Sequence, residues 1–141
     1  MIGGNSSSIF RSGSTEYPSH EDLIRGLLCK LVNDDKWEWV HFEAEDHRHC
    51  LEIADEEDLL LINLPFPFTK SLEETFRQAS LTFPATWQLT AFRERGWWRA
   101  GYAELAAPHQ DSERVVAFSV DVLQRLFCVT AREPIHGWLE R

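Results

Sequence analysis

Besides Glu45, six side chains that can bind a metal ion or transfer a proton lie within one ten-residue stretch of the chain, HFEAEDHRHC at residues 41–50. Imidazole, thiolate and carboxylate groups are the usual protein ligands of zinc, and histidine and carboxylate are common general acids and bases. These residue types allow two interpretations, a small metal or catalytic site or the polar end of a β-hairpin. The side chains are His41, Glu43, Asp46, His47, His49 and Cys50.

The register of the predicted hairpin decides which of these side chains share a face. A two-residue turn at 45–46 pairs Val40 with Leu51 and Phe42 with His49. Side chains alternate along a strand, so this register gathers Val40, Phe42, Leu51 and Ile53 on one apolar face. The apolar pattern therefore favours this register over a slip by one residue.

The same register divides the candidate ligands. His41 lies opposite Cys50, and both face away from His47 and His49. Zinc needs four ligands, or three and an open position, and neither pair reaches three. We therefore favour a polar hairpin and predict no metal ligand and no cofactor. The alternative is a small enzyme or a ligand- or metal-binding domain that uses the His41–Cys50 hairpin.

Motifs of the common enzyme classes are missing from the sequence. It contains no GxSxG, HExxH, GxxxxGK[ST] or GxGxxG pattern. We therefore predict no catalytic residue and expect that the protein is not an enzyme.

Composition and charge indicate one acidic domain. The chain has 141 residues, of which 43% are hydrophobic and 26% charged, and its net charge is −9. A negative field repels phosphate, so we expect binding neither to nucleic acid nor to a membrane. Three cysteines without a CxxC pair indicate reduced thiols and a cytoplasmic location.

Hydrophobic periodicity predicts an α+β domain over residues 18–141, preceded by a disordered tail at 1–17 that is rich in Gly and Ser. The order is helix, three strands, helix, two or three strands, helix, with a mostly antiparallel sheet. Helices are predicted at 19–34, 71–79 and 120–133, capped by Ser19, Ser71 and Ser119, and a short turn is predicted at 135–141. Strands are predicted at 36–44, 47–54, 58–66, 86–94, 97–105 and 113–119.

Tryptophan is abundant, with six residues in the chain. Trp37 and Trp39 alternate with Val40 in the first predicted strand and so face away from its apolar side. Trp97 and Trp98 are adjacent, so one of them leaves the main core. Large apolar patches and tryptophan are typical of interfaces, so we predict that these four tryptophans bind a partner and that the chain forms a symmetric homodimer. The alternative is that the third helix or the C-terminal segment covers them as a second core.

The order of elements resembles that of the type III secretion chaperone-like superfamily, which includes the YbjN-type bacterial regulators. The resemblance spans roughly residues 19–133 and is carried by HEDLIRGLLCKLV, KWEWVHFEA, HRHCLEIA, DLLLINLPF, SLEETFRQA and SVDVLQRLFCVTARE. It implies a non-enzymatic, dimeric protein that holds extended segments of partner proteins on apolar patches. We therefore expect a chaperone-like or regulatory protein-interaction domain that binds another polypeptide through an aromatic, acid-rimmed surface.

Overall fold

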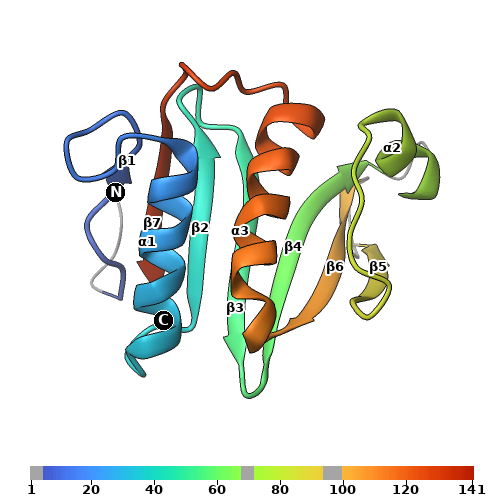
Figure 1. Cartoon of the computed structure of the whole chain (residues 1–141), viewed down its shortest axis with the longest axis horizontal. Helices are drawn as coiled ribbons and strands as arrows, with labels where there is room; N and C mark the ends of the chain where they lie inside the picture. The colour runs from blue at the N-terminus through green and yellow to red at the C-terminus, as the bar shows by residue number, and fades with distance from the viewer. Residues whose placement is uncertain (1–4, 68–71, 94–99) are drawn as a thin grey trace.

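The computed structural model describes residues 5–67, 72–93 and 100–141, and a seven-stranded antiparallel sheet forms its centre (Figure 1). The strands lie side by side in the order β1-β7-β2-β3-β4-β6-β5. Their bounds are β1 Phe10–Arg11, β2 Trp39–Ala44, β3 His49–Glu56, β4 Leu59–Pro67, β5 Gln88–Arg93, β6 Ala100–Pro108 and β7 Ile135–Glu140. The predicted α+β class is confirmed.

The helices gather on one face of this sheet. Figure 1 shows α1 (His20–Asn33) and α3 (Ser112–Asp121) in front of the strands. The short α2 (Leu72–Gln78) joins the same layer, because the ring of Phe76 lies 6.4 Å from that of Phe118 on α3. Within the described residues, neither α1, α2 nor α3 lies over the opposite face, which we call the open face.

Helix α1 forms as its sequence predicts. The Ser19 side chain accepts a hydrogen bond from the Asp22 backbone N–H at 3.1 Å, which caps the first turn. Leucine and isoleucine side chains spaced by three or four residues are buried against the sheet, at Leu23, Ile24, Leu27, Leu28 and Leu31. They meet the inward residues of β2, Val40 and Phe42, which are fully buried.

The segment 113–119, for which the sequence predicts a strand, lies in helix α3. Its valines favour a strand by propensity, but Val115, Ser119 and Val122 recur at helical spacing and are buried. The buried Ser119 hydroxyl donates to the Val115 carbonyl at 2.7 Å, so it is satisfied within the helix. Of the predicted helix at 120–133, residues 120 and 121 end α3 and Val122–Leu126 form a π-helical turn, whereas the prediction is wrong for 127–133.

Residues 135–140, for which the sequence predicts a turn, form the long strand β7 between β1 and β2. Its inward residues Ile135, Gly137 and Leu139 are buried below α1. Gly137 is required here, because a Cβ would lie 2.7 Å from a methyl carbon of Leu27 and 3.0 Å from the ring of Phe42.

The predicted disordered tail at 1–17 does not hold for residues 5–17. Phe10 and Arg11 form β1 on the edge of β7, and the Ser12 hydroxyl accepts from the Ile135 N–H at 2.8 Å. Tyr17 is 8% exposed and belongs to the main core, where its ring meets Phe10 edge-on. These contacts join segments that are far apart in the sequence, so they could not be predicted from the Gly- and Ser-rich composition of the tail.

The other predicted segments correspond to observed elements. Segments 36–44, 47–54, 58–66, 86–94 and 97–105 overlap β2 to β6. β2 begins only at Trp39, and β3, β4 and β6 extend past the predicted ends to Glu56, Pro67 and Pro108. Residues 95 and 96, between the predicted strands 86–94 and 97–105, lie outside the described residues, as does the predicted cap Ser71.

Candidate functional site

The turn that joins β2 to β3 is longer by one residue than the predicted two-residue loop. The Ala44 carbonyl accepts from the His47 N–H at 2.9 Å, and the Ala44 N–H donates to the Arg48 carbonyl at 2.9 Å. His47 adopts the left-handed conformation, with φ of 69°. This conformation shifts the pairing of the two strands by one residue.

A β-bulge at Cys50 shifts the pairing by a second residue. Phe42 lies opposite Leu51, but the next residue of β2, Glu43, lies opposite His49. Cys50 is therefore the extra residue of β3, and it interrupts the alternation of side chains along the strand. Cys50 and Leu51 both turn to the core and are fully buried, whereas His49 lies on the open face.

The bulge brings together side chains that the predicted register separates. His41 lies opposite Glu52 and not opposite Cys50. The rings of His41 and His49 lie 5.8 Å apart on the open face, so the predicted division between them is wrong. His47 remains apart at the turn, where its Nδ1 lies 3.3 Å from Glu43.

His41 sits between two carboxylates and a tryptophan. Its Nδ1 lies 3.1 Å from Glu52 on β3, and its Nε2 lies 2.8 Å from Glu140 on β7. The indole of Trp138 stacks on the imidazole, with ring centres 5.2 Å apart and an interplanar angle of 18°. The imidazole is only 14% exposed, so its ring plane and both of its nitrogens are held in place.

The carboxylates change the proton affinities of the cluster. Burial alone would lower the pKa of His41, but hydrogen bonds and charge interactions with Glu52 and Glu140 outweigh it and raise this pKa above its usual value. The hydrogen bond with His41 lowers the pKa of Glu52. Desolvation lowers the pKa of His49, which favours a neutral ring with a free lone pair.

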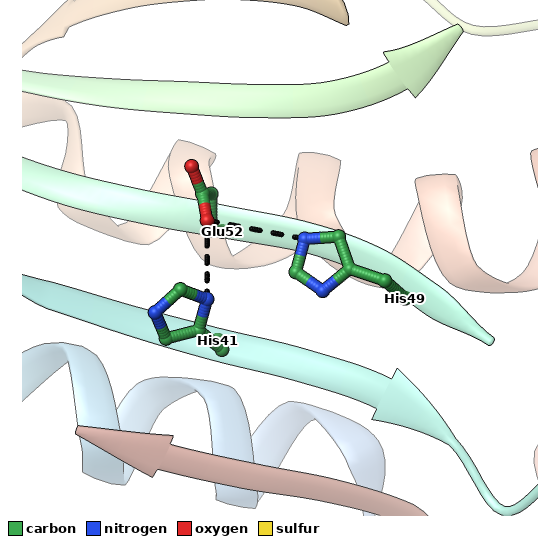
Figure 2. Close-up of side chains that lie close together, drawn as sticks. All are labelled: His41, His49 and Glu52. Atoms are coloured by element: carbon green, nitrogen blue, oxygen red, sulfur yellow. Dashed lines mark ion pairs between the residues drawn. The ribbon is translucent and has the colours of Figure 1, made fainter. Parts of the chain in front are cut away.

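Three of these side chains have the chemistry of a metal site. Figure 2 shows His41, His49 and Glu52 converging in front of the sheet, with the helices behind. His41 Nδ1 and His49 Nε2 lie 3.1 Å and 3.9 Å from the same Glu52 oxygen. One ligand atom from each residue lies within 4.8 Å of the other two.

Two cross-strand rows of side chains extend from this cluster over the open face. The polar row consists, in order of pairing, of Trp138, His41, Glu52, Asn63, Glu104 and Thr90. Burial, together with the charge of Glu56, raises the pKa of Glu104, and the buried Oδ1 of Asn63 has no hydrogen-bond partner among the described residues. The apolar row beside it consists of Trp39, Ala54, Leu61 and Ala106.

The tryptophans predicted to bind a partner do not form one group. Trp39 lies on the open face, but Trp37 precedes β2 and packs against the main core. Trp97 and Trp98 lie outside the described residues. Trp138, which the sequence prediction misses, stands in the polar row of the open face.

The sequence contains a pattern from which Trp138 and Glu140 could have been assigned to a strand. In IHGWLE, polar or aromatic residues alternate with apolar ones or glycine, which is the pattern of a half-buried strand. That pattern places His136, Trp138 and Glu140 on one face. Their proximity to His41 could not be read from it, because it depends on β7 pairing with β2.

Comparison of the chain with protein-family models, curated proteins and solved structures gave no significant match. The resemblance to secretion chaperones therefore stays a prediction. None of the helices in the described part of the chain is long and apolar enough to cross a membrane.

Proposed function

We propose that the protein is a non-catalytic interaction domain that binds a basic, extended segment of another polypeptide on the open face of its sheet. The observation that carries the proposal is the pairing of an apolar row with an acidic, polar row on a face that the described helices leave uncovered. Trp39 and Leu61 supply apolar contact area. Glu52 and Glu104 supply negative charge beside it.

The chemistry of this face favours a cationic partner. Lysine and arginine side chains combine a long apolar stem with a charged end, so they suit alternating apolar and acidic rows. The accessible indole of Trp39 offers an additional cation–π surface. The net charge of −9 attracts such a segment from a distance.

The same charge disfavours pairing of two copies through this face, because the acidic side chains of both copies would be brought close together. The predicted homodimer is therefore a separate proposal, tested by light scattering during size-exclusion chromatography. A monomer mass at tens of micromolar would contradict it.

The interaction is tested by selecting peptides from a random display library on the purified protein. We expect the selected peptides to combine lysine or arginine with apolar residues, and their affinity to fall as salt concentration rises. Fluorescence anisotropy with one selected peptide should show at least tenfold weaker binding to Trp39→Ala and to Glu104→Gln.

Glu113→Gln is the matched control, because it removes the same charge from α3 on the opposite side of the sheet. Its peptide affinity should equal that of the wild type within about twofold. Selection of acidic peptides, or equal losses in Glu104→Gln and Glu113→Gln, would refute the proposal.

A further inference from the structure

We propose that His41, His49 and Glu52 bind one zinc ion, with a fourth coordination position open to water on the open face. This inference does not rest on the proposed peptide binding. The carrying observation is that one ligand atom from each of the three residues lies within 4.8 Å of the other two. Two imidazoles and one carboxylate form a donor set that suits zinc and other late transition metals, and not magnesium or calcium.

Zinc binding would draw the three ligand atoms closer together. Ligand atoms around a tetrahedral zinc ion are about 3.3 Å apart, since each bond is about 2.0 Å long. His41 Nδ1 and Glu52 Oε2 are already 3.1 Å apart, and His49 Nε2 is 3.9 Å from the same oxygen. His49 is the residue that must move, and its side chain is the most exposed of the three, at 43%.

Glu140 and Trp138 prepare His41 for this role. Glu140 Oε2 lies 2.8 Å from His41 Nε2, so with Nδ1 on the metal this carboxylate would accept the hydrogen bond that Nε2–H donates. A carboxylate behind a metal-binding imidazole is the usual arrangement in zinc sites. The stacked indole of Trp138 fixes the plane of the ring.

The fourth position would lie on the open face of the sheet. Figure 2 shows the three side chains projecting from β2 and β3 on the side away from the helices. A zinc ion there would have three protein ligands, which is the number found in sites that keep an open position.

The test is titration of the EDTA-treated, desalted full chain with zinc chloride, followed by isothermal calorimetry. We expect one zinc ion per chain. His49→Ala and Glu52→Gln should each weaken binding at least tenfold, and Glu140→Ala should weaken it about 10- to 100-fold. Cobalt(II), used as a spectroscopic probe, should give the visible absorption of a tetrahedral complex in the wild type, and this absorption should be lost in His49→Ala.

His47→Ala is the matched control, because it removes an exposed histidine from the same hairpin without touching the cluster. Its zinc affinity should equal that of the wild type, and circular dichroism should show that all variants are folded. Failure to bind at 100 μM zinc would overturn the proposal. So would equal losses in His47→Ala and His49→Ala, which would indicate adventitious binding to surface histidines.

Discussion

Gly26 and Tyr17 are in contact. The effect of Gly26→Ala on the free energy of unfolding should therefore change sign when Tyr17 is replaced by alanine. Gly26 lies inside α1, and an ideal Cβ at this position would stand 2.5 Å from Cε1 of Tyr17. Tyr17 comes from the segment before the helix and is 8% exposed. An alanine at residue 26 therefore has to displace the tyrosine ring.

Two opposing effects determine how much Gly26→Ala changes the free energy of unfolding. Alanine is favoured over glycine in a helix interior by about 1 kcal/mol. Displacing a packed ring costs about 1–3 kcal/mol, so in the wild type the substitution should lower the free energy of unfolding by roughly 0–2 kcal/mol. In the Tyr17→Ala background the ring is gone, and the same substitution should raise this free energy by up to about 1 kcal/mol.

Urea denaturation of the wild type, the two single variants and the double variant measures this coupling. Tyr17→Ala alone should cost about 3–5 kcal/mol, as for other buried aromatic residues. We expect a coupling free energy of about 1–3 kcal/mol between residues 17 and 26. Ile9→Ala, at a position 54% exposed in the same segment, is the control background, in which Gly26→Ala should behave as in the wild type. Equal effects of Gly26→Ala in all three backgrounds, within about 0.5 kcal/mol, would refute the packing of Tyr17 on α1.

Two further predictions follow from the proton affinities. Desolvation raises the pKa of the buried Cys50 thiol to about 11. A thiol reagent at pH 8 should therefore label Cys29 and Cys128 in the native protein, and Cys50 only after denaturation. Rapid labelling of Cys50 in the native protein, located by mass spectrometry, would contradict its burial. The carboxylates around His41 raise the pKa of this histidine in the folded protein above its unfolded value of about 6.5. Their interaction with the protonated ring therefore stabilises the fold fully below pH 6.5, and this stabilisation is lost as the pH rises through the folded pKa. In EDTA, the difference in free energy of unfolding between the wild type and Glu140→Gln should therefore be larger at pH 6 than at pH 9. A difference that does not change with pH would show that protonated His41 is not stabilised by Glu140.

Local patterns predicted most of the elements because they depend on neighbours in sequence. The cap at Ser19 and the leucine spacing after it specify α1 without reference to the rest of the chain. The same reasoning failed at 113–119, where valine content favours a strand and burial spacing favours a helix. Packing against α1 and the sheet decides that competition in favour of α3, and propensity cannot measure it.

Contacts between distant segments could not be predicted from such patterns. β7 lies between β1 and β2, so the N-terminal and C-terminal segments of the chain pair with each other at one edge of the sheet. That pairing brings Glu140 and Trp138 to His41, and it brings Ser12 to Ile135. An alternating pattern can indicate that 135–140 is a strand, but it carries no information about which strand lies beside it.

The candidate metal cluster depends on one extra residue in β3. Without the bulge at Cys50, strict alternation would place His49 on the core face with Leu51, and His41 would face Glu52 alone. The apolar pattern alone does not locate the bulge, since β3 contains two adjacent buried pairs, Cys50 with Leu51 and Ile53 with Ala54, and only the first of them is bulged. What moves the histidine to the open face is the shift in pairing from Phe42 opposite Leu51 to Glu43 opposite His49. The same break that invalidates the predicted register therefore supplies the second imidazole of the cluster.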